Sequence, residues 1–399
     1  MKNILFLLII LIYSHNLNAQ IINIPDANFK AALINLGIDA NIDGQISVFE
    51  AESCTQLAIS NNNISDLTGI EAFVHLEILY CDNNLLTDLN LSSNIALSLL
   101  DCNTNQLINL DIHNNVYLAY LSCYNNQLAS VDLTNNTFLT FIDCCYNQLS
   151  TINLYNHDSL TILYCDYNLL TNLNVTSNTN LLTMDCGKNQ LTSLDVTNNI
   201  ALRTLYCDQN QLTNIDLTQN VNLQYFTCSG NLLTSLDLSH NVELVFLNIS
   251  NGCPEGGTNY LTYLDLSHNS LLEFISINNM PTLVEVCVWV IPFPPLSVSS
   301  LVSDVGVNFS DICLSNLTSK YIDPIIIYPT FATNWINVKC DNLMKIDIEI
   351  VNSSGNRIFS KQYKSINTIQ IDISSIPLGI YIVSANSDNF EKTEKIIKH

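Results

Sequence analysis

The sequence predicts a mostly β protein: a solenoid of stacked parallel strands, preceded by a small helical cap and followed by an antiparallel β-sandwich. Three observations lead to this prediction. A 21-residue repeat occupies more than half of the 399 residues, a helical pattern precedes it, and short strands of alternating polarity follow it. Periods of roughly 20 to 50 residues are typical of solenoids, in which each repeat buries its apolar face only against its neighbours.

Residues 1–19 have the order of a secretory signal peptide. Lys2 precedes an apolar run from Ile4 to Tyr13, and Ala19 supplies the small residue of a cleavage site. The alternative is a buried strand or helix. The apolar run is too short to span a bilayer comfortably, and no later stretch is long enough. We therefore expect export with cleavage after Ala19, and no transmembrane segment.

Residues 20–56 form the predicted N-terminal cap. A short amphipathic helix is expected here, with Ile24, Phe29, Leu33 and Leu36 on one face. The next twelve residues, DANIDGQISVFE, resemble an EF-hand calcium loop. This resemblance implies a sharp turn at Gly44 and a packed Ile46. The implied oxygen ligands are Asp39, Asn41, Asp43, Gln45, Ser47 and Glu50. It implies calcium as a structural ion of the cap, whereas a polar turn in a helical hairpin is the alternative.

The repeats span residues 57–288 and follow the pattern LxxLxCxxNxL. The cysteines recur at a constant spacing of 21 residues, at Cys81, Cys102, Cys123, Cys144, Cys165, Cys186, Cys207 and Cys228. A strand alternates its side chains, so Leu163 and Cys165 point inward while Ile162 and Tyr164 point outward. The full wording, LxxLxCxxNxLxxLDLxxNxx, resembles the leucine-rich-repeat superfamily and its bacterial class called IRREKO. The resemblance implies one short parallel strand per repeat.

The ladder cysteines are predicted to be buried, reduced thiols. Stacked strands place equivalent side chains about 4.8 Å apart, whereas a disulfide needs Cβ atoms about 3.8 Å apart. Zinc is not expected, because the ladder supplies no tetrahedral set of ligands. Cys145 is expected on the outer face as an exposed thiol. Cys287 and Cys313 are candidates for a disulfide in the C-terminal cap, while the states of these two and of Cys54, Cys253 and Cys340 stay open.

Two polar ladders accompany the cysteines. The first is predicted to satisfy backbone groups of adjacent turns. It consists of Asn84, Asn105, Asn126, Asn147, Asn168, Asn189, Asn210 and Asn231. The second stacks like charges, which repel each other at strand spacing. It consists of Asp111, Asp132, Asp195, Asp216, Asp237 and Asp265, with interruptions at Asn90, Asn153 and Asn174.

Residues 289–321 are expected to cap the open end of the core and to link it to a second module. In residues 322–399, short apolar runs alternate with Gly, Asn and Ser turns, which predicts an antiparallel β-sandwich. Tyr328, Pro329, Gly355 and the stretch Pro377–Tyr381 resemble the C-terminal sorting domain of the type IX secretion system of Bacteroidetes, although its usual opening motif is altered. An ordinary accessory sandwich is the alternative. The resemblance implies contact with the type IX secretion machinery.

The charge of the chain restricts its partners. It carries a formal net charge of −23, and residues 20–319 hold 28 acidic residues against Lys30, Lys188 and Arg203. Binding of a phosphate backbone depends on Lys and Arg, so nucleic acid and anionic lipid surfaces are not expected as partners. Cationic partners, neutral glycans and divalent metal ions remain compatible with this charge.

The outward face of the predicted sheet is the candidate ligand-binding site. Its aromatic and acidic positions are Tyr80, Asp101, Tyr120, Phe141, Asp143, Tyr164, Asp185, Tyr206 and Tyr225. Such a stripe is typical of interaction surfaces. No motif joins a nucleophile to a base, so no enzyme is predicted. We expect a secreted or outer-membrane surface protein that binds a protein or glycan along this face. A structural or adhesive spacer and an inhibitor of a foreign enzyme are the alternatives.

Overall fold

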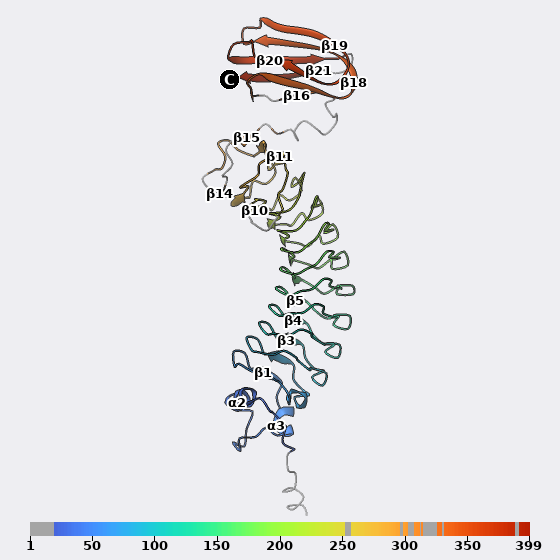
Figure 1. Ribbon diagram of the computed structural model, residues 1–399, viewed down its shortest axis with the longest axis vertical. Helices are drawn as coiled ribbons and strands as arrows, with labels where there is room; N and C mark the ends of the chain where they lie inside the picture. Colours follow the sequence, from blue (N-terminus) through green and yellow to red (C-terminus); the bar gives the residue numbers. More distant parts are fainter. Residues whose placement is uncertain are drawn as a thin grey trace, which may run out of the picture. The chain divides into compact units, whose positions relative to one another are not determined.

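The computed structural model shows two compact units, Met1–Cys313 and Leu314–His399 (Figure 1). It describes residues 20–251, 257–295, 298–301, 307–311, 313, 325–328, 331–387 and 391–399. The predicted signal peptide, residues 1–19, and Cys253 lie outside the described residues. Among the described helices, none is long and apolar enough to cross a membrane.

The first unit begins with two short helices, α2 (Ala27–Asn35) and α3 (Val48–Glu52). Asp26 caps α2, because its carboxylate accepts hydrogen bonds from the backbone N–H groups of Asn28 and Phe29 in the first turn. Phe29 and Leu33 are buried in the same core as the solenoid. The prediction that Leu36 shares this face is wrong, because the helix ends at Asn35 and leaves Leu36 45% exposed.

The solenoid consists of three-residue strands stacked in parallel, one per turn. Within the described residues, twelve strands form one sheet: β1 (Gln56–Ala58), β2 (Ile78–Tyr80), β3 (Leu99–Asp101), β4 (Tyr120–Ser122), β5 (Phe141–Asp143), β6 (Ile162–Tyr164), β7 (Thr183–Asp185), β8 (Thr204–Tyr206), β9 (Tyr225–Thr227), β10 (Phe246–Asn248), β12 (Phe274–Ser276) and β14 (Ser299–Leu301). A short 3₁₀ helix, η1 (Ile70–Ala72), lies between β1 and β2. Figure 1 shows the successive turns from β1 to β10. The predicted parallel solenoid is therefore confirmed.

A second, three-stranded parallel sheet begins in the late turns. Its strands are β11 (Tyr263–Asp265), β13 (Glu285–Cys287) and β15 (Asn308–Ser310). Strands β14 and β15 continue the stacking into the segment 289–321, where the sequence suggested only a cap. Phe293 contacts both Trp289 and Phe309, and all three rings pack against the core of the solenoid.

The core of the solenoid is a column of leucines and cysteines. From β1 to β13 the middle residue of each strand, such as Leu79 or Leu163, is fully buried, and all eight ladder cysteines are fully buried and free. Burial raises the pKa of these thiols above the ordinary value. The predicted ladder of buried, reduced thiols is confirmed.

Cys145 departs from its prediction. It was expected to be an exposed thiol, but the structure leaves it 7% exposed. Asp143 accepts a hydrogen bond from its backbone N–H at 3.2 Å, and the thiol hydrogen-bonds the carboxylate of Asp166. Neighbouring side chains on the outer face therefore cover this position, and burial raises the pKa of the thiol.

The predicted asparagine ladder joins adjacent turns, as Asn168 illustrates. Its Nδ2 donates to the carbonyl oxygens of Cys144 and Cys165 at 3.0 and 3.2 Å. Its Oδ1 accepts from the backbone N–H of Leu149 at 2.9 Å. One side chain thus satisfies buried backbone groups of its own turn and of the preceding turn, which confirms the structural role predicted for this ladder.

A second ladder of buried asparagines runs through the other half of each repeat and was not anticipated. Its members are Asn94, Asn115, Asn136, Asn178, Asn199, Asn220, Asn241 and Asn269. Asn178 Nδ2, for example, donates to the carbonyl oxygens of Leu154 and His157 at 3.0 Å each. His157 takes the place of an asparagine here, fully buried, and its Nε2 has no partner among the described residues.

We expect His157→Asn to raise the free energy of unfolding by about 1–2 kcal/mol. An asparagine would make the two Nδ2 hydrogen bonds found at other positions of this ladder in place of the single contact of His157 Nδ1 with the Tyr155 carbonyl. Its Oδ1 would lack a partner, as the Oδ1 of the other asparagines and Nε2 of His157 do among the described residues, so that cost does not change. Denaturant unfolding followed by circular dichroism measures the change. The control is the exposed His113→Asn, which should change stability by less than about 0.5 kcal/mol. Destabilisation by His157→Asn would contradict the prediction.

The second unit is a six-stranded β sheet that folds around one core. Its strands are β16 (Ile325–Tyr328), β17 (Phe331–Ala332), β18 (Trp335–Asn352), β19 (Arg357–Asp372), β20 (Gly379–Asn386) and β21 (Glu391–Lys398). All strand pairs are antiparallel except β17 with β21. Buried residues from both ends of the long strand β18, such as Ile336 and Ile348, belong to the same cluster. This confirms the predicted antiparallel β module.

Candidate functional site

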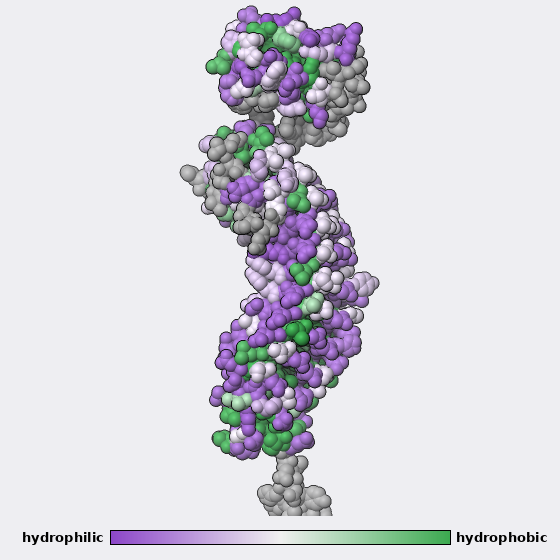
Figure 2. Space-filling model, in the orientation of Figure 1, coloured by the Kyte–Doolittle hydropathy of each residue, from purple (hydrophilic) through white to green (hydrophobic). Residues whose placement is uncertain are grey.

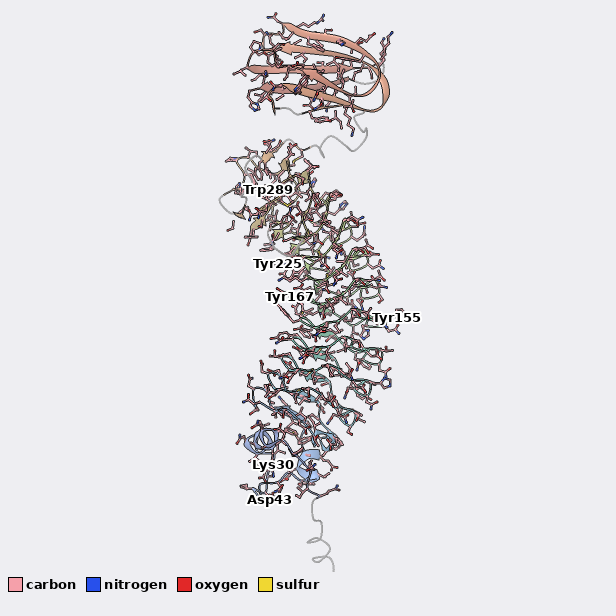
Figure 3. The ribbon with its side chains drawn as sticks, viewed as in Figure 1. Lys30, Asp43, Tyr155, Tyr167, Tyr225 and Trp289 are labelled. Atoms are coloured by element: carbon pink, nitrogen blue, oxygen red, sulfur yellow. A yellow bond between two sulfur atoms is a disulfide. The ribbon has the colours of Figure 1, made fainter. Side chains whose placement is uncertain are left out.

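The EF-hand-like loop lies between α2 and α3 and folds its polar side chains onto its own backbone. Asp39, only 7% exposed, accepts hydrogen bonds from the backbone N–H groups of Asp43 and Gly44 at 3.1 and 2.9 Å. Asn41 Oδ1 also accepts from Asp43 N–H, and Asp43 Oδ1 accepts from Gln45 N–H, both at 2.8 Å. The loop is therefore a tight polar turn. Figure 3 labels Asp43 at its outer end.

Glu50 closes the loop from the start of α3. Its Oε1 accepts from the backbone N–H of Ala40 at 3.0 Å, and its Oε2 accepts from both N–H and hydroxyl of Ser47 at 2.8 Å. Burial raises the pKa of Glu50, but these hydrogen bonds outweigh burial and hold the pKa below the usual value. Glu50 is thus an ionised, anchored carboxylate, as a closing ligand needs to be.

Other features of the loop bear on calcium binding: its turn and its buried contact favour a calcium site, whereas the spacing of its carboxylates does not. Gly44 has φ +77°, which a sharp turn at this position requires, and Ile46 is buried. Ile42 is 87% exposed at φ +60°, a conformation that β-branched residues rarely adopt. The Gln45 side chain accepts from Lys30 Nζ at 2.9 Å. Asp39, Asp43 and Glu50 all belong to the EF-hand-like loop, but their carboxylate oxygens do not all lie within 4.8 Å of one another.

The predicted binding residues lie in two adjacent columns on the outer face of strands β2 to β9. One column contains Tyr120, Phe141 and Tyr225, and the other Tyr80, Asp101, Asp143, Tyr164, Asp185 and Tyr206. We call these two columns the sheet face. Nearly all of its side chains are half-buried. In the view of Figure 2, hydrophobic residues form separate green patches within a largely hydrophilic surface.

Aromatic rings on the sheet face pack against one another. Tyr120 stacks on Phe141 with ring centroids 4.2 Å apart, and Phe141 meets Tyr164 edge-on at 5.9 Å. Such pairs stabilise each other and cover part of each ring. The sheet face is therefore partly self-packed, yet its rings keep an accessible edge or face.

Carboxylates of the sheet face lie in an environment that disfavours their charge. Burial, followed by the charge of Asp166, raises the pKa of Asp185 to about 7. Burial also raises the pKa of Asp101, Asp143 and Asp166. Between residues 31 and 319 the basic residues are Lys188 and Arg203, and neither belongs to the two columns.

The aspartates of the ladder that contains Asp132, Asp195 and Asp216 have lowered pKa values, in contrast to the carboxylates of the sheet face. Asp132, Asp195 and Asp216 accept hydrogen bonds from the hydroxyl and backbone N–H two residues later, and these bonds lower the pKa of each. Hydrogen bonds from Ser239 lower the pKa of Asp237 in the same way. These aspartates form local turns, so hydrogen bonds oppose the expected repulsion. Raised and lowered pKa values thus separate the sheet face from the turn aspartates.

A further group of residues, missed from the sequence, lies where the chain leaves strands β5, β6 and β7. Tyr146, Tyr167 and Lys188 occupy equivalent positions of three successive turns. Tyr146 stacks on Tyr167 with centroids 3.9 Å apart, and Lys188 Nζ lies 3.9 Å from the Tyr167 ring centroid and donates to its hydroxyl. They line a hollow of about 490 Å³, which we call the rim hollow. The signal was available in the sequence, because other repeats carry Asn, Thr, Gln or Gly at this position.

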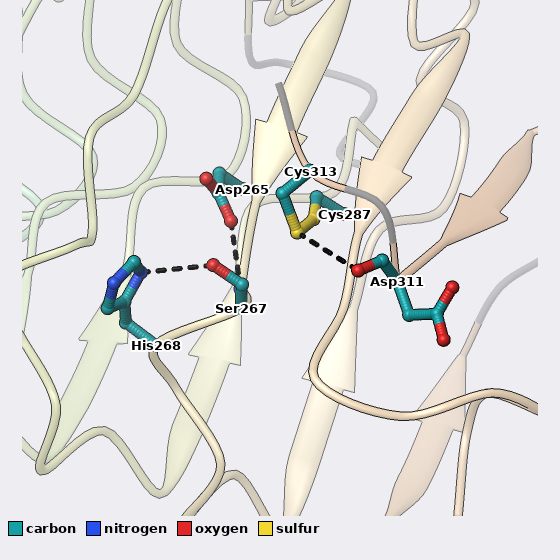
Figure 4. The surroundings of a disulfide bond; sticks show 6 residues. All are labelled: Asp265, Ser267, His268, Cys287, Asp311 and Cys313. Carbon is teal, nitrogen blue, oxygen red and sulfur yellow. Dashed lines mark hydrogen bonds between the residues drawn. A yellow bond between two sulfur atoms is a disulfide. The ribbon is translucent and has the colours of Figure 1, made fainter. Parts of the chain in front are cut away.

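Cys287 and Cys313 form a disulfide in the late turns (Figure 4). Asp265 lies beside them, and among the described residues this is the one group of three His, Cys, Asp or Glu ligand atoms within 4.8 Å. Since a disulfide has no thiolate to offer, the group does not form a metal site. The free, buried Cys54 stands apart from it.

Comparison with known proteins supports both units. Residues 326–399 match the family described as secretion system C-terminal sorting domain. The chain is similar to the functional domain of InlJ from Listeria monocytogenes, which includes a cysteine ladder, with 24% identity, a TM-score of 0.60, and coverage of 94% of this chain and 97% of that one. The chain is also similar to an internalin from the same organism, inlF, with 19% identity and a TM-score of 0.53. The match covers 72% of this chain and 96% of that one. No curated protein matched.

These similarities establish architecture and export. At such identity the structural matches show the fold alone, a leucine-rich-repeat-like solenoid. The family match confirms the sorting domain identified from the sequence, which indicates type IX secretion to the cell surface or the external environment.

Proposed function

We propose that this secreted or surface protein is a non-enzymatic recognition protein that binds a basic protein segment along the sheet face. The observation that carries the proposal is the set of half-buried carboxylates around Asp185, whose pKa burial raises to about 7 beside Tyr164 and Tyr206. A carboxylate that has lost water gains from a cation. A Lys or Arg side chain supplies that charge, and tyrosine rings pack along its stem.

This chemistry favours a basic ligand over the other options. A neutral glycan at the sheet face would leave the carboxylates without a counter-charge. A solenoid that acts only as a spacer would have no need of desolvated carboxylates beside aromatic rings, because such groups cost stability unless they are paired. The spacer is the second candidate, supported by the long regular stack itself.

The test is a binding screen with the full chain on arrays of Lys- and Arg-rich, neutral, and Asp- and Glu-rich peptides. We expect binding to basic peptides that weakens about tenfold or more in Tyr164→Ala plus Tyr206→Ala, and also in Asp185→Asn. Affinity should rise by up to about tenfold from about pH 6 to about pH 8, because Asp185 becomes charged over that interval.

Tyr155→Ala is the matched control, since Tyr155 is 71% exposed and does not belong to the sheet face. It should leave affinity unchanged. If a folded chain bound no basic peptide, or bound equally well after the double substitution, the recognition proposal would fail and the spacer would take its place.

We also propose that calcium orders the N-terminal cap, held by Asp39, Asn41, Asp43 and Glu50 side chains. Extracellular loops of this kind bind calcium with dissociation constants of about 10⁻⁴ to 10⁻³ M. At a hundredfold excess over the dissociation constant, calcium would stabilise the cap by about 2.7 kcal/mol. Glu50→Gln should abolish the effect, while its amide oxygen still accepts from Ser47 in the capping box.

Titration calorimetry with calcium, and thermal unfolding in calcium against chelator, measure this effect. Gln148→Ala, far from the loop in sequence and exposed, is the control and should respond like the unmodified chain. Absence of both heat of binding and thermal shift in the unmodified chain would remove calcium from the account. Recognition by the sheet face would be unaffected by that result.

A further inference from the structure

We propose that the rim hollow is a second binding site, independent of the sheet face, and that it takes a neutral glycan. The rim hollow lies where three successive turns leave their strands, and Tyr146, Tyr167 and Lys188 form its aromatic and basic part. Its volume of about 490 Å³ falls in the range of small-molecule sites, about 300–1,000 Å³.

The backbone at these positions has a left-handed conformation that is shared by the equivalent residues of other repeats. Tyr146 and Tyr167 both have φ +51°, and Lys188 has φ +48°. Asn83 and Asn125 occupy the same position in other repeats at φ 52° and 53°. Asparagine adopts this left-handed conformation more readily than tyrosine or lysine does. Thr104 and Gln209 also occupy this position, both at φ 51°, so the repeat imposes the conformation and the side chains alone distinguish the rim hollow.

The chemistry of the lining identifies the class of ligand. Apart from Tyr146, Tyr167, Lys188 and Leu169, the lining consists of Asn and Gln, and it contains no carboxylate in a chain of net charge −23. Asn147, Asn168 and Asn189 belong to the asparagine ladder and are bonded to the backbone, so Asn125, Gln190 and Gln209 supply the amide groups for a ligand. These amides both donate and accept, which matches the hydroxyl groups of a sugar. An exposed tyrosine ring offers a flat apolar face to the carbon skeleton of a pyranose.

The state of each ring decides where a sugar would stack. Tyr146 stacks on the Tyr167 ring and Lys188 donates to the Tyr167 hydroxyl, so Tyr167 is engaged both at a ring face and at its hydroxyl. Tyr146 is 47% exposed and is the next turn after Asn125, another lining residue. We therefore assign Tyr146 as the stacking platform. Tyr167 and Lys188 are positioning residues that hold the ring of Tyr146 in place.

Charge excludes the other ligand classes. A basic peptide would meet Lys188 and no carboxylate in the rim hollow. An acidic polysaccharide would be repelled by the surrounding polyanion, whose field extends about 8 Å at physiological ionic strength. A neutral glycan avoids both penalties.

Affinity electrophoresis of the full chain tests the proposal, with dextran, mannan, xyloglucan and a β-1,3-glucan as neutral probes and polygalacturonate as the acidic probe. We expect retardation by at least one neutral polysaccharide. Tyr146→Asn should weaken that binding about tenfold or more, because it removes the stacking ring. Folding is protected, since asparagine is the residue found at this position in two other turns.

Tyr155→Asn makes the same chemical change outside the rim hollow, and Figure 3 places Tyr155 and Tyr167 on opposite edges of the solenoid. This control should keep full retardation. Tyr164→Ala plus Tyr206→Ala should also keep it, whereas Tyr146→Asn should leave binding of basic peptides intact, so the two proposals fail separately. No retardation by any neutral probe, retardation by polygalacturonate alone, or equal retardation of Tyr146→Asn would each overturn the assignment.

Discussion

Above about pH 9 the solenoid is expected to lose stability steeply, at about 11 kcal/mol per pH unit. Eight buried ladder thiols cause this, because burial raises their pKa above the ordinary value of 9.0. In the unfolded chain they ionise near 9, whereas in the folded chain they stay protonated. The stabilisation is therefore complete below that pH and is lost as pH rises toward the folded-state values. Each thiol contributes about 1.4 kcal/mol per pH unit.

Total stabilities of domains are about 5–15 kcal/mol, so one pH unit above 9 should suffice to unfold the repeats. Circular dichroism with denaturant, in the presence of a reductant, follows the change from about pH 8 to about pH 10. Replacing four adjacent ladder cysteines, Cys123, Cys144, Cys165 and Cys186, by valine halves the number of titrating groups and should halve the slope. A stability that stays flat to about pH 10 would show that the thiols are not buried as described.

Asn168→Ala is expected to lower the free energy of unfolding by about 3–5 kcal/mol. The substitution removes the hydrogen bonds to Cys144 and Cys165 and leaves the buried N–H of Leu149 without its acceptor. A stranded buried group costs about 1–3 kcal/mol, and each lost hydrogen bond about 0.5–1.5 kcal/mol. Denaturant unfolding of both proteins measures the difference.

Gln148→Ala is the control for Asn168→Ala. Gln148 carries the same amide group but is exposed, so its loss should change stability by less than about 0.5 kcal/mol. If Asn168→Ala lowered the free energy of unfolding no more than Gln148→Ala does, the asparagine ladder would not contribute to stability. The turns would then depend on the leucine and cysteine core alone.

Periodicity made most of this fold predictable. The spacing from Cys81 to Cys228 indicated the parallel direction of the strands and the length of each turn, and the alternation within each strand indicated the residues of the sheet face. The second unit could be predicted for a different reason, since its apolar residues alternate between Gly and Asn turns. In both units, residues at a regular spacing in the sequence have the same burial, so the spacing predicts which side chains lie on a common face.

What could not be predicted depends on contacts that break the pattern. Cys145 is buried because Asp143 and Asp166, from two neighbouring turns, happen to cover it. Leu36 is exposed because the helix stops one residue earlier than its apolar periodicity suggests. The rim hollow requires Tyr146 and Tyr167 to stack, and that depends on a left-handed backbone which the spacing of leucines does not reveal.

The regular spacing of bonds between turns has a consequence for how such a chain can change over generations. Within the described part of the chain, ladder asparagines bond to their own turn and to the turn before it, as Asn168 shows with Cys165 and Leu149, and to no turn farther away. Recombination that deletes or duplicates one complete turn therefore rejoins surfaces that already fit. The copy number of turns can drift while the fold is kept, and the length of the exposed face becomes a trait on which selection for longer or shorter ligands can act.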